Sequence, residues 1–262
     1  GGRIIVDGAG PELPDAVCLR RTPVEIRGVE RLDGGWLDAL ARCSWAAVVL
    51  PDLRELTATD AQTLGDSRAS LVDLPGLATL DEPSALQLAR LGTFTERGPA
   101  RLHLPGLRQI SPGVARALSM SQAQTLDLSG LQQLDVASAT HLAAFRGRQL
   151  DLGGLQAATL PVVQALGAYD GGGGSRAELR LGGVDTLDLA TAKALAQHPR
   201  LRLTLVHVTT LTPDGLAVFA ESTGPTASIL ALPALARLPT DVAGALAAVP
   251  SVLELPALAE LD

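Results

Sequence analysis

Apolar residues repeat along this chain with a nearly constant spacing of about 24 residues. A frame that begins at the first apolar residue of each Leu-x-Leu-like pair starts at Val24, Val48, Val72, Leu102, Leu126, Leu150, Leu179, Leu203, Leu230 and Leu253. The sixth position of this frame is leucine or valine in every copy, and the seventeenth is leucine or phenylalanine wherever a copy reaches it. Such strict repetition predicts a stack of similar units that share one continuous core.

Each unit is predicted to contain a short strand followed by a short helix. The apolar alternation at the start of the frame is typical of a strand whose alternate side chains point inward. The fourteenth position, mostly alanine, and the seventeenth, almost always leucine, are three residues apart, so they share one helical face. The tenth position holds short oxygen-bearing side chains that can cap a helix start. These predicted structural caps are Asp33, Thr57, Asp81, Ser111, Asp135, Thr159, Asp188 and Thr212.

The repeated motif resembles a known family. Leu-x-Leu-x-Gly-Leu-x-x-Leu, as at Leu102 to Ile110 and Leu126 to Leu134, followed by Ala-x-x-Leu, is similar to bacterial repeats of the leucine-rich-repeat superfamily. The resemblance implies an α/β fold: a right-handed solenoid, horseshoe or arc, with parallel strands on the concave face and short helices on the convex face. One departure is that leucine or valine, as at Leu107 and Leu131, replaces the family's common asparagine after the strand.

The resemblance covers nearly the whole chain. We expect residues 1–23 to form a degenerate N-terminal coil or cap, and residues 24–262 to form a solenoid of about ten coils with the last one truncated. The truncated coil would leave an apolar edge, which suggests a homodimer or an intramolecular contact through that edge.

Composition narrows the possible functions. The 262 residues are 47% apolar but only 2% aromatic, so the core must be built from leucine, alanine and valine. The net charge of −7 argues against binding nucleic acid or an anionic membrane. No apolar run approaches the roughly 18 residues of a membrane span. Two cysteines, Cys18 and Cys43, cannot form a disulfide framework, so we expect a cytoplasmic protein.

Motifs for chemistry are missing from the sequence. There is no G-x-S-x-G elbow, P-loop, H-E-x-x-H or paired-cysteine signal. Ser129-Gly130 belongs to a repeated turn with glycine at Gly76, Gly106, Gly154 and Gly183. His103 with two nearby aspartates, Asp127 and Asp151, lacks the second histidine or the spacing of a metal site. We therefore predict a protein that is not an enzyme and needs no cofactor or metal.

Function in a repeat stack is expected on the strand residues that the core does not use. Those side chains are most polar between Arg101 and Thr204. We predict that a protein partner binds the concave strand face through Arg101, His103, Thr125, Asp127, Gln149, Asp151, Glu178, Arg180, Arg202 and Thr204. Two alternatives stay open: the row is a solvated sheet face, or the chain is a scaffold or regulatory segment excised from a larger multidomain bacterial protein.

Overall fold

The computed structural model describes residues 4–7, 22–42, 45–92, 99–173, 177–196, 201–222, 229–238, 242 and 252–261. Predictions about Cys18, Cys43 and most of the N-terminal coil at residues 1–23 therefore lie outside the described residues.

The strands form one 11-stranded sheet in which they follow one another in chain order. Every strand pair that the structure describes in it is parallel and in register, as when Leu102 of one strand faces Leu126 of the next. The strands are β1 (Ile4–Asp7), β2 (Pro23–Arg27), β3 (Ala47–Val49), β4 (Leu71–Asp73), β5 (Arg101–His103), β6 (Thr125–Asp127), β7 (Gln149–Leu152), β8 (Glu178–Leu181), β10 (Arg202–Leu205), β12 (Ile229–Ala231) and β14 (Val252–Glu254).

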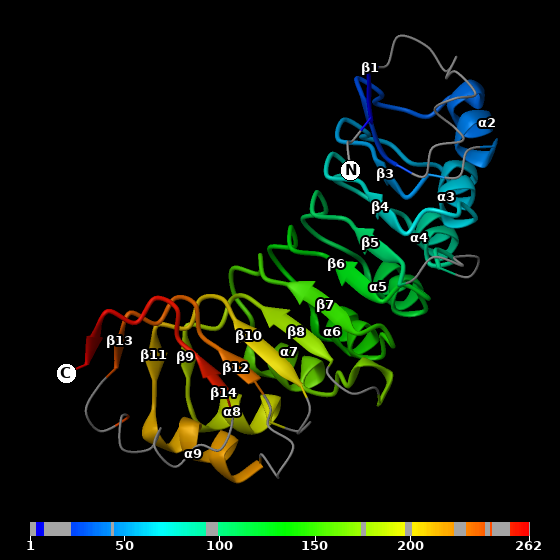
Figure 1. The fold of residues 1–262 in the computed structure, drawn as a ribbon. Helices are drawn as coiled ribbons and strands as arrows, with labels where there is room; N and C mark the ends of the chain where they lie inside the picture. The colour runs from blue at the N-terminus through cyan, green and yellow to red at the C-terminus, as the bar shows by residue number, and fades with distance from the viewer. Residues whose placement is uncertain are drawn as a thin grey trace. The chain divides into compact units, whose positions relative to one another are not determined.

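Short helices alternate with these strands and lie along one side of them (Figure 1). The helices are α2 (Gly34–Arg42), α3 (Ala58–Gly65), α4 (Glu82–Leu88), α5 (Pro112–Ser119), α6 (Val136–Ala143), α7 (Leu160–Leu166), α8 (Leu189–Leu195) and α9 (Pro213–Ser222), with a 3-10 turn at η1 (Gly171–Gly173). This regular alternation confirms the predicted α/β, leucine-rich-repeat-like fold class. Among the described residues, no helix is long and apolar enough to cross a membrane.

The chain divides into two compact units, Gly1–Leu131 and Gln132–Asp262. In both units the phased residues form the core. Leu102 and Leu126 in the first unit and Leu150 and Leu179 in the second are fully buried at the first frame position. The leucines at the seventeenth frame position are buried in the same way, as at Leu118. The recurring phase therefore predicts the core correctly wherever the structure describes it, apart from the last coil, where Leu253 and Leu258 are only partly buried.

The turn after the strand carries a buried apolar side chain at the position where leucine-rich repeats commonly have asparagine. Leu107 and Leu131 are fully buried. Their backbone amides donate to the carbonyls three residues earlier, Leu107 to Leu104 at 3.2 Å and Leu131 to Leu128 at 3.0 Å. The turn thus satisfies these amides with main-chain acceptors, and the side chain is free to pack in the core.

The repeated turn glycine is needed for close approach between coils. A Cβ atom on Gly76 would lie 2.4 Å from the Pro51 carbonyl oxygen, and one on Gly106 would lie 2.4 Å from the Pro75 carbonyl oxygen. The same atom on Gly130 would lie 1.8 Å from the carbonyl oxygen of Pro105. Each glycine therefore fits against the proline carbonyl of the preceding coil, which gives Gly130 a structural role in the turn.

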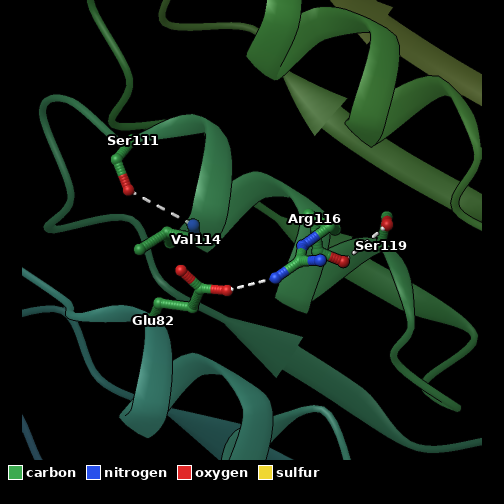
Figure 2. Close-up of polar contacts among 5 residues, drawn as sticks. All are labelled: Glu82, Ser111, Val114, Arg116 and Ser119. Carbon is green, nitrogen blue, oxygen red and sulfur yellow. Dashed lines mark hydrogen bonds and ion pairs between the residues drawn. The ribbon is translucent and has the colours of Figure 1, made fainter.

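Seven of the eight predicted caps are confirmed as hydrogen-bond acceptors. Figure 2 shows one example, in which the Ser111 hydroxyl accepts a 3.3 Å hydrogen bond from the amide of Val114. The exception is Thr159, which occupies the N-cap of α7 but makes no side-chain cap hydrogen bond. Proline at the second helical position does not explain this difference, because α4 has Pro83 at the same position and Asp81 still accepts a 2.9 Å hydrogen bond from the Ser84 amide. The other caps are Asp33, Thr57, Asp81, Asp135, Asp188 and Thr212.

Removing a cap should destabilise the protein in a pH-dependent way. The amide of Thr191, 2.8 Å from Asp188 Oδ1, and next the Thr191 hydroxyl, hold the pKa of Asp188 below its ordinary value of 3.8. A carboxyl group with a lowered folded-state pKa contributes stability at higher pH and loses it as the pH falls through that pKa. Asp188→Ala should therefore cost about 1 kcal/mol near neutral pH, and the cost should shrink in urea titrations below pH 3.8. Thr159→Ala, which removes no cap bond, is the matched control; an equal cost in both variants would contradict this role of Asp188.

Two short strand pairs were not predicted. β9 (Thr186–Leu187) pairs with β11 (Thr210–Leu211), and β13 (Arg237–Leu238) pairs with β15 (Glu260–Leu261), both in parallel. All four lie at the eighth and ninth frame positions, just before the helix segment. They add a second set of main-chain bonds between coils in the unit Gln132–Asp262.

Candidate functional site

The strand residues that alternate with the core leucines form the candidate site. In the first unit we call them the N-terminal open face: Leu71, Asp73, Arg101, His103, Thr125 and Asp127. In the second unit we call them the C-terminal open face: Gln149, Asp151, Glu178, Arg180, Arg202, Thr204, Ile229, Ala231 and Glu254. All ten residues predicted to bind a partner are on these faces, and each is at least partly exposed.

The two faces are ordered by strand register. On the N-terminal open face, Arg101 lies between Leu71 and Thr125 of the adjacent strands, and His103 lies between Asp73 and Asp127. Because the first and third residues of a short strand point to the same side, these six side chains share one face. Toward β2 and β3 most of the equivalent positions are closed. Glu25, Ala47 and Val49 are each only 7% exposed, and only Pro23 at the start of β2 is exposed among the four.

The charges of the C-terminal open face are mostly paired with one another. Arg180 Nε lies 3.9 Å from Asp151 Oδ2 on the adjacent strand. Arg202 Nε lies 4.0 Å from Glu178 Oε1, which is an ion-pair distance but too long for a hydrogen bond. Arg202 Nη2 also donates a 2.7 Å hydrogen bond to Glu254 Oε2. Arg202 therefore links two carboxylates on this face.

The Arg202–Glu254 pair crosses an intervening strand. β12 lies between β10 and β14, and its Ala231 faces Thr204 on one side and Glu254 on the other. Alanine leaves room for the long arginine to reach across, and Ala231 itself is only 7% exposed. Glu254 is thus part of the face, although the predicted set ended at Thr204. Nothing in the local sequence marks a partner 52 residues away.

Two predicted aspartates support the turns that follow their strands. Asp127 Oδ1 accepts a 2.8 Å hydrogen bond from the amide of Ser129. Asp151 Oδ1 accepts an equivalent 2.8 Å bond from the amide of Gly153. Both carboxylates are therefore bound to their own turns as well as lying on the open faces. His207, outside the predicted set, has a similar role, because its Nδ1 accepts a 3.1 Å bond from the amide of Gly183.

Arg101 differs from the other arginines in the sheet. The strands of the 11-stranded sheet contain four arginines. Three are paired: Arg180 and Arg202 as above, and Arg27 with Glu25 at 2.7 Å. The exposed Arg101 side chain has no hydrogen-bond or ion-pair partner within the described ranges, and the same holds for the side chain of His103. The N-terminal open face therefore presents cationic and hydrogen-bonding capacity, at Arg101 and His103, that no other described residue uses.

The ion pair over β12 should contribute little to stability. The Arg202 and Glu254 side chains are 40% and 41% exposed, so solvent screens their attraction. A double-mutant cycle with Arg202→Ala and Glu254→Ala should give a coupling free energy of about 0.2 to 1 kcal/mol. Urea denaturation of the four proteins measures this coupling. A value of several kcal/mol would mean that the pair holds β14 in place, which its exposure argues against.

Neither open face presents an arrangement typical of a metal site. Among the described residues, no three histidine, cysteine, aspartate or glutamate side chains come together in a way that could hold a metal ion. Each face by itself offers a row of hydrogen-bond donors, acceptors and charges at the spacing of adjacent parallel strands, about 4.8 Å. Such a row can bind an extended polar surface along several coils.

Comparison with known proteins adds no family assignment. No protein-family model matches this chain, and no curated protein matches it either.

Proposed function

We propose that this chain is a member of the leucine-rich-repeat superfamily that acts as a non-enzymatic binding module. Its partner is a protein, and the partner binds on the open faces of the strands rather than on the helices. The repeat phase of the sequence and the alternation of parallel strands with short helices support the family assignment.

The observation that carries the binding proposal is that exposed and buried side chains alternate within single strands. Arg101 and His103 remain accessible, whereas Leu102 between them is fully buried. In the second unit Arg202 and Thr204 are partly exposed around the buried Leu203. In β4, β5, β6, β7, β8 and β10 the core thus uses one side of the strand, and the other side carries mostly polar residues available to a partner. Varied polar side chains on a constant framework are typical of a recognition surface.

The direct test compares arginine substitutions on the two sides of the repeat. A partner is first isolated with the intact chain and purified, and its affinity is then measured by calorimetry. Thr125→Arg and Thr204→Arg place a large cation on the N-terminal and C-terminal open faces. At least one of them should weaken binding by about fivefold or more, because bulk and charge are introduced where the partner docks. The melting temperature should stay unchanged, since both positions are partly exposed.

Thr140→Arg is the matched control for that test. Thr140 is exposed on helix α6, so the same substitution leaves both open faces intact. Binding that is weakened by Thr140→Arg but not by either strand variant would assign recognition to the helix side and contradict the proposal.

A further inference from the structure

We infer that the N-terminal open face binds an acidic segment of the protein partner, with Arg101 holding a carboxylate of that segment. This inference rests on the proposed function, because it names the chemistry of the partner for the same surface. The contrast between the two open faces carries it.

The first step is that the C-terminal open face has little free charge to offer. Arg180 and Arg202 already have carboxylate partners on neighbouring strands, and Arg202 contacts two of them. An incoming acidic group would have to compete with these carboxylates for the arginines. Recognition of a charged partner is therefore weakest where the face is neutralised by its own residues.

The second step is that the N-terminal open face cannot neutralise Arg101 in the same way. Its in-register neighbours, Leu71 and Thr125, carry no charge. The carboxylates on the two adjacent strands, those of Asp73 and Asp127, lie opposite His103 rather than opposite Arg101. One oxygen of Asp127 is also bonded to the Ser129 amide. The guanidinium thus projects from the face with five N–H donors and no carboxylate partner within the described part of the chain.

The third step is the fit of a carboxylate to this position. A guanidinium binds a carboxylate through two parallel hydrogen bonds, a geometry that a point charge cannot offer. His103 lies two residues further along β5, roughly 6.6 Å away, and can donate a further hydrogen bond. Partly exposed Leu71 adds an apolar contact beside Arg101. An extended peptide with a glutamate or aspartate next to an apolar residue matches these three side chains.

The test titrates the 262-residue chain with blocked hexaglutamate and hexalysine peptides. Backbone and arginine side-chain NMR signals are followed during each titration. Because the protein carries a net charge of −7, its overall field opposes an acidic peptide, so binding of hexaglutamate reports a local site. We expect hexaglutamate to shift the signals of β4, β5 and β6, and Arg101→Glu to weaken its binding about fivefold or more.

Arg108→Glu is the matched control, because Arg108 is exposed in the same coil but does not lie on the open face. Hexaglutamate binding should be little changed in this variant. The inference is overturned if hexaglutamate does not bind, or if Arg101→Glu and Arg108→Glu weaken its binding equally. It is also overturned if hexaglutamate shifts the protein signals of β8 and β10 instead, or if hexalysine binds the N-terminal open face more tightly than hexaglutamate does.

Failure of this inference can be told apart from failure of the proposed function. If the purified partner is sensitive to the strand substitutions but hexaglutamate does not use Arg101, only the acidic chemistry is wrong. If the partner is sensitive to Thr140→Arg alone, the binding face itself is wrong, whatever the peptides do.

Discussion

Leu128→Ala is expected to destabilise the protein by about 2 to 5 kcal/mol. Leu128 is the third residue of its frame, follows strand β6 directly and is fully buried. Truncation removes buried methyl groups and leaves a cavity that neighbouring coils can close only in part. The Leu128 carbonyl also accepts the turn hydrogen bond from Leu131, so relaxation around the cavity would disturb that turn. Urea denaturation followed by circular dichroism measures the loss.

Leu86→Ala makes the same chemical change on the surface. The Leu86 side chain is 39% exposed on helix α4, so its removal should cost about 1 kcal/mol or less. Equal losses for the two variants would mean that Leu128 is no more buried than Leu86, and the assignment of phased leucines to the core would be wrong.

Gly130→Ala is expected to be comparably severe for a different reason. An added Cβ atom would lie 1.8 Å from the Pro105 carbonyl oxygen and 2.9 Å from the Leu107 carbonyl oxygen, far inside van der Waals contact. Both atoms belong to the backbone of the preceding coil, so neither can rotate away. We expect a loss of about 3 kcal/mol or more, because the two coils must separate to admit the methyl group.

Gly34→Ala is the matched control for that prediction. An added Cβ atom on Gly34 would meet no other atom within 4 Å, and the residue begins helix α2. This substitution should be neutral or stabilise the protein by up to about 1 kcal/mol, because alanine restricts the unfolded chain. If the Gly130→Ala and Gly34→Ala proteins had the same melting temperature, Gly130 would not be required for close approach between coils.

The sequence was sufficient to predict the framework because the framework repeats. Leucines at a fixed phase must meet equivalent neighbours in every coil, so positions such as Leu102 and Leu118 could be assigned to the core without coordinates. The caps followed the same logic, since an oxygen-bearing residue before each helix has amides within reach. Thr159 makes no side-chain cap bond although it occupies the N-cap of α7, a local detail that the repeat pattern does not encode.

The open faces were predictable in position but not in pairing. Strand alternation places Arg101 and Arg202 on the same kind of surface. Whether each arginine finds a carboxylate depends on side-chain reach across strands and on the small size of intervening residues such as Ala231. Asp127 could not be recognised as a turn acceptor from its frame position, because the same position holds histidine in the coil before. These contacts depend on side-chain geometry rather than on periodicity.

The central claim, that the strands from β4 to β8 and β10 give one side to the core and the other to the surface, can be measured along β5. Three proteins with a single cysteine are made from a Cys18→Ser and Cys43→Ser background by adding Arg101→Cys, Leu102→Cys or His103→Cys, and each is labelled with a maleimide under native conditions. Arg101 is exposed, Leu102 is fully buried and His103 is partly exposed. We therefore predict rapid labelling at positions 101 and 103 and labelling at position 102 that is slower by orders of magnitude. Labelling at position 102 as fast as at its two neighbours would contradict the account.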